Sequence, residues 1–286
     1  MVGIFDTHAH YDSRQYLEDR EEVLKRVHET VGCIINSGAD MKSSHTSLEL
    51  AGKYDFIYAS VGVHPDSAGE LVFCEKRDLA EGEASEGEPE FIPEEDCRKN
   101  REELERLCDE KKAVAVGEIG LDYHWNVWPK EIQQGAFIWQ WELALKKDLP
   151  IVIHSRDAAE DTIRIVREMY ARNGKKPLKA DMHCYSYSVE LAEEYLKMGL
   201  MFGIGGVVTF KNSKKLKEVV DMLPLERMLL ETDCPYMAPD PFRGKRNDSA
   251  HLSLVAEKIA EIKGVDVSRV YEQTRENARG FFTKVK

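Results

Sequence analysis

The stretch AVAVGEIGLDYHWNVWPKEIQQGAFIWQWELALKKDLPIVIHS, from Ala113 to Ser155, contains two short apolar runs on either side of a long amphipathic segment. The runs AVAVGEIG and PIVIHS have the length and apolar character of buried strands. The segment from Lys130 to Lys147 has the apolar spacing of a helix. A strand, a helix and a second strand in this order predict a βαβ unit with parallel strands.

The same alternation continues in both directions along the chain. Eight apolar runs begin at Val2, Gly32, Phe56, Ala113, Pro150, Lys179, Leu200 and Arg227. Helical patterns lie between them, and two more follow the eighth run. Short, apolar strands paired evenly with helices favour a closed parallel (β/α)8 barrel over an open doubly wound sheet. No Gly-x-Gly-x-x-Gly pattern follows the first run, which disfavours a dinucleotide-binding fold.

The length of the chain and its net charge limit the classes of protein to which it can belong. The chain has 286 residues, and we expect one barrel domain over residues 1–286. Its 52 acidic and 40 basic residues give a net charge of -12, which argues against a protein that coats nucleic acid through its overall charge. This net charge is compatible with an enzyme that binds only the end of a nucleic acid in one local site. Two short basic stretches, KNSKKLK from Lys211 and FRGKRN from Phe242, are most often solvated helix faces.

Three further features concern location and redox state. The six cysteines show no Cys-x-x-Cys spacing, so we expect free thiols. No apolar run is long enough to cross a bilayer and no signal-like segment opens the chain, so we expect no membrane contact and a cytoplasmic protein, or a nuclear one in a eukaryote. The acidic segment EGEASEGEPEFIPEED, residues 81–96, predicts a surface insertion between the third strand and its helix.

Potential metal ligands occur where the predicted strands end. In a (β/α)8 barrel the chemistry lies at the C-terminal ends of the strands. Six of the eight predicted strands end in an imidazole or a carboxylate: His8, His10, His64, Glu118, His154, His183 and Asp233. In FDTHAHYD, from Phe5 to Asp12, alternate residues of a strand place His8 and His10 on one face, as a pair of metal ligands requires.

Each of these residues has a structural alternative. His64 precedes Pro65 and could simply end a strand, and Glu118 could be a buried carboxylate held by a lysine. The chain has nine histidines, and five of them lie at strand ends beside two carboxylates. A separate structural role for each of the five is a poorer explanation than one shared site. Unpaired buried charges cost several kcal/mol, so an apolar barrel mouth would hold this set only if a cation bound there. Imidazole and carboxylate ligands without thiolate suit Zn, Mn, Co, Fe or Mg.

The motifs FDTHAHYD, GVHP, VGEIGLDY, PIVIHSRDA, HCYS and LLETDCPYMAP, in this order, resemble the TatD family of metal-dependent deoxyribonucleases within the amidohydrolase superfamily. The resemblance spans nearly the whole chain and implies a distorted (β/α)8 barrel of the metallo-dependent hydrolase type. It also implies two divalent metal ions per chain, Mg, Mn or Zn. Carried over by matching motifs, one ion would be held by His8, His10, Glu118 and Asp233, and the other by Glu118, His154 and His183.

The resemblance further implies hydrolysis of DNA phosphodiester bonds, and we expect a 3′-5′ exonuclease that acts on single-stranded DNA ends. Glu118 would bridge the two ions, which would activate a water. Asp233 would orient or deprotonate that water. We expect His64 and Arg156 at the substrate phosphate. The aromatic residues after the fourth strand could stack on bases or pack a loop onto the barrel rim; they are Tyr123, Trp125 and Trp128.

Two other functions stay open at this stage. A metal-dependent hydrolase could act on another ester or amide, such as a lactone or a misacylated tRNA. Many amidohydrolase barrels bridge their ions with a modified lysine on the fourth strand, so Glu118 there favours the nuclease branch. A catalytically idle scaffold is disfavoured by the complete ligand set. The segment HCYSYS departs from the family pattern at Tyr185 and Tyr187, which could alter access to the site.

Overall fold

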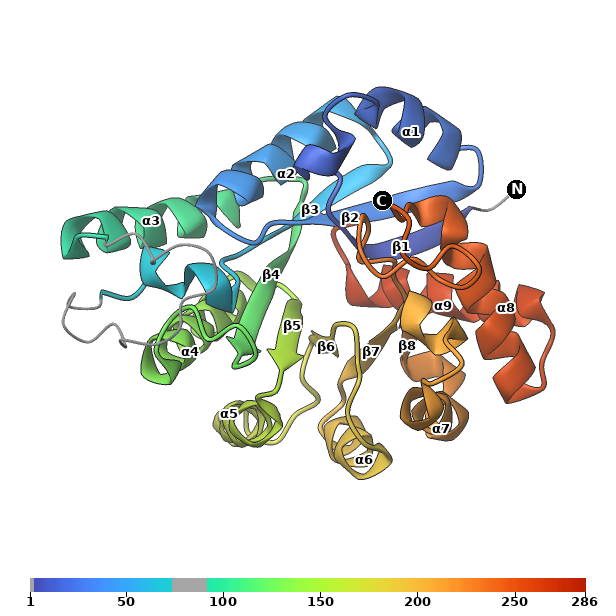
Figure 1. Ribbon diagram of the computed structural model, residues 1–286. Coiled ribbons are helices and arrows are strands. Elements are labelled where there is room, and N and C mark those ends of the chain that lie inside the picture. The colour runs from blue at the N-terminus through green and yellow to red at the C-terminus, as the bar shows by residue number, and fades with distance from the viewer. Residues whose placement is uncertain (1–2, 74–91) are drawn as a thin grey trace.

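Eight parallel strands form one sheet that curls into a nearly closed barrel, and helices surround it (Figure 1). The computed structural model describes residues 3–73 and 92–286. The strands pair in sequence order: β1 (Ile4–Ala9), β2 (Val31–Ser37), β3 (Ile57–Val61), β4 (Ala113–Asp122), β5 (Ile151–Arg156), β6 (Ala180–Met182), β7 (Met201–Ile204) and β8 (Met228–Leu230). The predicted (β/α)8 barrel is therefore confirmed.

The helices alternate with the strands, and two follow the last strand, as predicted. They are α1 (Arg20–Val27), α2 (Met41–Lys53), α3 (Glu94–Leu107), α4 (Lys130–Lys147), α5 (Ala159–Arg172), α6 (Val189–Lys197), α7 (Lys214–Met222), α8 (Leu252–Lys263) and α9 (Val267–Phe281). Short 3-10 turns join several elements: η1 (Arg14–Tyr16), η2 (Pro65–Glu70), η4 (Gly206–Thr209), η5 (Leu225–Arg227) and η6 (Ser249–His251). The predicted helix from Lys130 to Lys147 matches α4, which follows Pro129 and ends at Asp148 with φ of 51°.

A buried carboxylate joins the first strand to the last. Asp6 on β1 accepts hydrogen bonds from the backbone N–H of Thr232 at 3.1 Å and from its hydroxyl at 2.7 Å. The backbone N–H of Asp233 also donates to the carbonyl of His8 at 3.0 Å. These contacts draw the segment after β8 against β1. Residues at the two ends of the chain therefore reach the same site.

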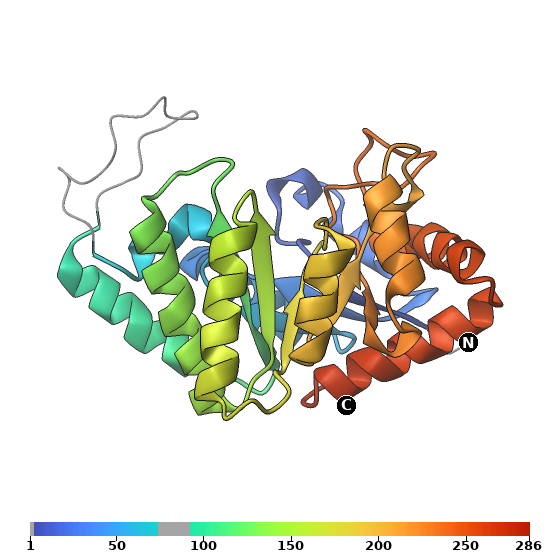
Figure 2. The ribbon, with the colours of Figure 1, turned by 90° about the horizontal axis from the view of Figure 1, so that it is seen from below.

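The N-terminal end of the barrel is closed by α9, which lies beneath the strands in Figure 2. Phe281 and Phe282 at its end join an apolar cluster with strand residues that include Phe5, Val114 and Val152. The rings of Phe5 and Phe282 are stacked with their centres 6.1 Å apart. Since this end is filled by apolar side chains, a substrate can enter the barrel only from the opposite end.

Part of the expected acidic insertion can be compared with the structure. Residues 81–91 of it lie outside the described residues, and Glu94–Asp96 form the first turn of α3. All five cysteines among the described residues are unpaired, as predicted; Cys74 is outside them. None of the helices found in the described ranges, 3–73 and 92–286, has both the length and the apolar character needed to cross a membrane.

Candidate metal centre

A cavity of about 640 Å³ opens at the C-terminal end of the strands. The structure brings together there every residue that the sequence proposed as a site residue. Those that line the cavity are His10, His64, Glu118, His154, Arg156, His183 and Asp233. His8 is fully buried beside them, at the base of the site. The side chains come from the ends of six different strands, so the barrel fold alone assembles them.

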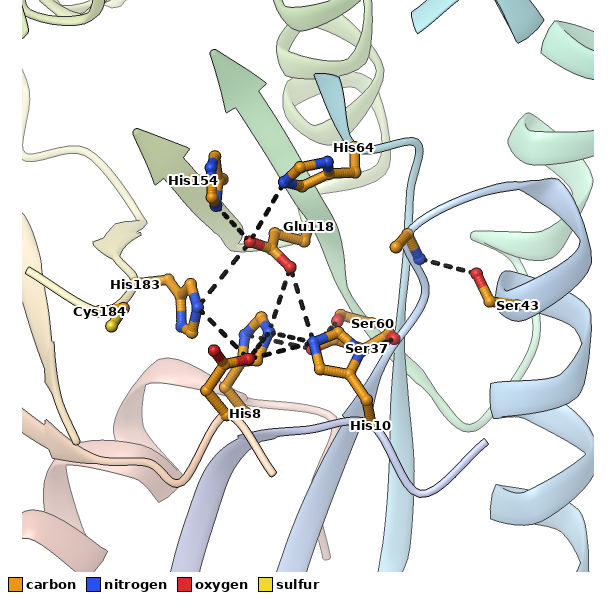
Figure 3. A network of polar contacts seen from close by, with 12 residues as sticks. His8, His10, Ser37, Ser43, Ser60, His64, Glu118, His154, His183 and Cys184 are labelled. Atoms are coloured by element: carbon orange, nitrogen blue, oxygen red, sulfur yellow. Dashed lines mark hydrogen bonds and ion pairs between the residues drawn. The ribbon is translucent and has the colours of Figure 1, made fainter. Parts of the chain in front are cut away.

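Glu118, on β4, is the centre of this arrangement (Figure 3). Its Oε2 faces the two imidazoles of β1, with His8 Nε2 at 3.3 Å and His10 Nε2 at 3.7 Å. Its Oε1 faces imidazoles from three other strands: His154 Nδ1 at 2.7 Å, His183 Nε2 at 3.8 Å and His64 Nε2 at 3.8 Å. The two oxygens of one carboxylate thus divide the imidazoles into two sets. No lysine is among the partners of Glu118 that the structure describes. The alternative in which Glu118 is a buried carboxylate held by a lysine is therefore wrong.

A glycine allows β4 and β5 to approach at this point. Gly120 has φ of +147°, and a Cβ atom there would lie 1.9 Å from the carbonyl oxygen of His154. Any larger residue would push the two strands apart. The glycine in VGEIGLDY therefore helps to bring His154 within 2.7 Å of Glu118.

The cluster of imidazoles and carboxylates shifts the pKa values of its members. Burial opposes ionisation of Glu118, but the surrounding imidazoles, His183 foremost, hold its pKa well below the usual range. Burial also opposes protonation of His10, whereas its hydrogen bond with Asp233 raises the pKa of His10 to about 9. Burial lowers the pKa of His64 to about 3. Glu118 is therefore ionised and His64 is neutral at physiological pH.

Each β1 imidazole has its outer nitrogen, Nδ1, held by Ser37 at the end of β2. His10 Nδ1 lies 3.0 Å from the backbone carbonyl oxygen of Ser37, which can only accept, so Nδ1 carries the proton. His8 Nδ1 lies 3.2 Å from the Ser37 hydroxyl, which also accepts a hydrogen bond from Ser60. Because the pKa of His10 is raised, Nε2 also carries a proton without a metal ion and donates to Asp233; a bound ion would replace this proton at Nε2.

Two carboxylates hold the remaining imidazoles in the same way. Glu231, fully buried, lies with Oε2 3.0 Å from His183 Nδ1. Asp122, at the end of β4, lies with Oδ2 3.0 Å from His154 Nε2. Since both partners are acceptors, the outer nitrogens carry protons, and His183 Nε2 and His154 Nδ1 are the nitrogens that face Glu118 and that a metal ion would use.

This donor set fits divalent metal ions. Neutral imidazole nitrogens with their outer N–H groups held by carboxylates or carbonyls are how metal-binding histidines are oriented in proteins. Among the described residues, four sets have potential ligand atoms that all lie within 4.8 Å of one another, and each set could hold an ion. They are His8 with His10 and Asp233, His8 with Glu118 and His183, His64 with Asp122 and His154, and His183 with Cys184 and Glu231. Oxygen and nitrogen donors dominate: imidazole nitrogen suits Zn, and carboxylate oxygen suits Mg and Mn.

His64 differs from the other imidazoles of the cavity. Its Nδ1 accepts the backbone N–H of Asp66 at 3.2 Å, which caps η2. The ring proton is therefore assigned to Nε2, the nitrogen that faces Glu118 Oε1 across 3.8 Å. His64 thus has its outer nitrogen as the acceptor and its inner nitrogen as the donor, whereas in His10, His154 and His183 the outer nitrogen is a donor.

Arg156 and the aromatic residues after β4 have separate roles. Arg156 is exposed at the rim of the cavity, with its guanidinium 5.6 Å from the ring centre of Trp125, which is also exposed. Trp128 is buried and donates its indole N–H to the carbonyl of Asp66 at 3.1 Å. Tyr123 donates its hydroxyl to Asp161. Of the three aromatic residues, Trp125 alone presents most of its ring to solvent, while Trp128 packs the loop onto the rim.

The two tyrosines that depart from the family pattern support the walls of the cavity. Tyr185 is buried, lines the cavity and donates its hydroxyl to the carbonyl of Ser188 at 2.7 Å. The Tyr187 hydroxyl lies 2.9 Å from the Ser155 hydroxyl, next to His154 on β5. The loop after β6 is thereby fastened to the end of β5. Among residues 3–73 and 92–286, no side-chain hydrogen bond or ring contact joins either tyrosine to a predicted ligand.

Sequence reasoning missed Ser37, Asp122 and Glu231. Ser37 ends an apolar run and looks like a core residue, so the sequence carries no signal for its role. Asp122 and Glu231 lie in the quoted motifs VGEIGLDY and LLETDCPYMAP, each a few residues from a predicted ligand. Histidine ligands need outer acceptors, so carboxylates beside them could have been proposed.

Known proteins with this sequence pattern are metal-dependent hydrolases. The sequence model of the family described as TatD related DNase matches residues 5–283. The chain is 41% identical over 280 residues to the uncharacterized metal-dependent hydrolase YabD of Bacillus subtilis, covering 98% of each chain. It is 30% identical to the 3′-5′ ssDNA/RNA exonuclease TatD of Erwinia tasmaniensis over 98% of this chain and 99% of that one.

A solved structure agrees with these sequence matches. The crystal structure of YJJV, a TatD homologue from Escherichia coli, superimposes with a TM-score of 0.83 at 26% identity and covers 99% of both chains. Since the family match runs almost from end to end and relatives at 30% identity or more span the whole chain, the chain belongs to the TatD family of metal-dependent hydrolases.

Proposed function

We propose that this chain is a divalent-metal-dependent exonuclease that removes nucleotides from the 3′ end of single-stranded DNA. The observation that carries the proposal is the position of Glu118, whose two oxygens face two different sets of imidazoles at the base of an open cavity. A carboxylate placed in this way suits two ions about 3.5 to 4 Å apart, the separation used in phosphoester hydrolysis. The name of the Erwinia relative supports the polarity and the single-stranded substrate.

In this proposal the ions are held as the family motifs suggest. One lies among His8, His10, Glu118 and Asp233, and the other among Glu118, His154 and His183. Bound ions would supply Lewis acidity at the phosphoryl oxygens and a lower pKa for water. The chain itself holds the outer nitrogens of these imidazoles through Ser37, Asp122 and Glu231, so that the inner nitrogens are the ones directed at the site, where a bound ion would replace their protons.

Asp233 has the position of a general base. It lines the cavity, and its Oδ1 lies 3.3 Å from His10 Nε2. Burial opposes its ionisation, but the hydrogen bond from His10 and the nearby imidazoles lower the pKa of Asp233. The ionised carboxylate takes the proton of the attacking water, and the water oxygen forms the new bond to phosphorus as the bond to the leaving 3′ oxygen breaks.

Two donors are available for the phosphate itself. His64 directs an Nε2–H into the cavity. Arg156 lines the same cavity from β5 and can hold two phosphate oxygens with its planar guanidinium. Donors fixed before the substrate arrives stabilise charge that develops on the non-bridging oxygens.

The test is digestion of a 5′-labelled single-stranded oligonucleotide by the purified protein with added Mn²⁺ or Mg²⁺. We expect a ladder of labelled products that shortens from the 3′ end, and a rate lower by about 10² to 10⁴ in Asp233→Asn. A lactone panel and a misacylated tRNA are assayed in parallel. Rapid turnover of either, with the oligonucleotide left intact, would contradict the proposed function.

A further inference from the structure

Two basic segments that are far apart in the sequence lie together beside the cavity. They are the segment from Lys211 into α7 and the loop after β8 that contains Arg243. The Arg243 guanidinium lies over the ring of Phe210, 4.3 Å from its centre. The backbone N–H of Asp240 donates to the Thr209 hydroxyl at 2.9 Å. Figure 2 shows α7 and the loop after β8 on the same side of the barrel.

We call the exposed cations of these two segments the basic ridge: Lys211, Lys214, Lys215, Arg243 and Lys245. The segments meet where Arg243 contacts Phe210, and Lys215 lies farther along, near Glu190 on α6. Across residues 3–73 and 92–286, no carboxylate forms an ion pair with any of the five, in contrast to Arg246, which pairs with Asp19. In a chain with a net charge of -12, unpaired cations gathered at one place are a local exception. Their Coulomb attraction is available to an external anion.

The ridge is continuous with the cavity. Val207, just before the ridge, and Leu216, within the first turn of α7, both line the cavity wall. Tyr236 and Met237, after β8, complete this wall and are exposed at its rim. The Tyr236 ring is 6.4 Å from the imidazole of His10, so an aromatic surface lies between the candidate metal ligands and the ridge.

Another part of the cavity wall is acidic. Asp12, Asp40 and Asp66, which follow β1, β2 and β3, all line it. A polyanion that occupies the cavity is repelled by this wall and attracted toward the ridge. The charges around the opening therefore favour one direction for a strand that leaves the site.

We propose that the basic ridge binds the backbone of the single-stranded nucleic acid that extends from the scissile phosphate, with a base adjacent to that phosphate stacked on Tyr236. The inference rests on the proposed function, since it takes the substrate to be a strand whose end lies in the cavity. The strand then runs from the metal centre over Tyr236 and across the loops after β7 and β8. Phosphates neutralised by lysine and arginine release counterions, so this part of the binding energy depends on salt.

The test compares a ridge variant with a matched control. The ridge variant carries Lys211→Gln, Arg243→Gln and Lys245→Gln. The control carries Lys25→Gln, Lys111→Gln and Lys176→Gln, three exposed cations that precede β2, β4 and β6 at the other end of the barrel. Both are made in an Asp233→Asn background, which keeps the strand intact. Binding of a fluorescent single-stranded 15-nucleotide probe is measured by anisotropy from low to moderate salt.

We expect the ridge variant to bind the probe at least about tenfold more weakly at low salt, and the slope of log Kd against log salt to become shallower by about 2, since each phosphate contact on a single strand contributes roughly 0.7. The control should bind like the parent. Tyr236→Ala should weaken binding with no change of slope, because stacking releases no counterions. Equal affinity and slope in ridge variant and control would overturn the proposal.

A second assay separates this proposal from the proposed function. Hydrolysis of bis(p-nitrophenyl) phosphate, which is too short to reach the ridge, is measured with the same substitutions on the otherwise unchanged chain. We expect equal rates for parent, ridge variant and control. A lower rate in the ridge variant alone would show damage to the site and would overturn the assignment of the ridge to strand binding. If the parent cleaves no phosphodiester yet its probe binding depends on the ridge, the ridge stands and the proposed function fails.

Discussion

The imidazole Nδ1 of His183 lies 3.0 Å from Oε2 of Glu231, and Oε1 of the same carboxylate accepts the backbone N–H of Cys184 at 2.6 Å. Both oxygens of Glu231 therefore face donors. The carboxylate fits because residue 203 is glycine: a Cβ atom there would lie 2.0 Å from Oε2. A fully buried side chain behind His183 thus fixes which nitrogen of His183 faces Glu118.

Glu231→Gln should weaken metal binding. The amide offers one oxygen and one NH₂ group, so one of the two N–H donors would face another donor. We expect the affinity for Mn²⁺ to fall about 10- to 100-fold, the usual effect of losing an outer partner of a histidine ligand. Competition with a fluorescent chelator measures this affinity for Mn²⁺. Glu226→Gln, at an exposed position on η5, is the control; equal affinities for the two variants would show that Glu231 does not orient His183.

The two tryptophans after β4 should respond differently to truncation. Trp128→Ala removes a buried ring and should lower the free energy of unfolding by about 3 to 5 kcal/mol. Trp125→Ala removes an exposed ring and should leave stability nearly unchanged. If a base stacks there, oligonucleotide binding should weaken by about 1 to 3 kcal/mol. Urea unfolding and anisotropy check both effects, and unchanged binding in Trp125→Ala would remove Trp125 from the substrate site.

Glu70 should make stability depend on pH. Burial raises the pKa of Glu70 to about 7, although it accepts the backbone N–H of Met41 at the start of α2. The folded state then holds a proton that the unfolded state releases above its pKa of about 4.5, so this group makes the protein less stable as pH rises from about 4.5 through 7. We expect Glu70→Gln to be more resistant to urea than the parent at pH 8, by up to about 3 kcal/mol.

The comparison at low pH provides the check on Glu70. At pH 5 the parent carboxyl is protonated in the folded state and the pH is only just above the unfolded pKa, so most of the advantage of Glu70→Gln should be lost there. Urea unfolding at both pH values tests this. An equal difference between the two proteins at pH 5 and pH 8 would mean that Glu70 titrates normally.

Much of the fold could be predicted from the sequence because each strand of the barrel is a short apolar run with a turn at its end. The convergence of Glu118 and His154 followed from the rule that strand ends meet at one face of a barrel. The role of Asp6 could not be predicted, since its alternation with His8 and His10 suggests a shared site, whereas it is buried against Thr232 between β1 and β8.

Other features of the site depend on three-dimensional contacts that no local pattern encodes. Trp125 and Trp128 are three residues apart in one loop, and only packing distinguishes the buried ring from the exposed one. The tautomer of His64 follows from a backbone N–H two residues later, whose direction is set by η2. The basic ridge forms because two segments some thirty residues apart meet. The sequence alone does not show that the loops after β7 and β8 lie side by side.

The central claim is that Glu118 binds two metal ions and that Asp233 accepts the proton of the attacking water. A Mn²⁺ titration of Glu118→Gln and Asp233→Asn tests this claim most directly. Bound metal and initial rate on a single-stranded oligonucleotide are measured together. In Glu118→Gln we expect weaker metal binding and partial recovery of the rate at high Mn²⁺. In Asp233→Asn we expect a rate lower by about 10² to 10⁴ that added metal does not restore. Tight binding of two ions by Glu118→Gln, or rescue of Asp233→Asn by metal, would contradict these roles.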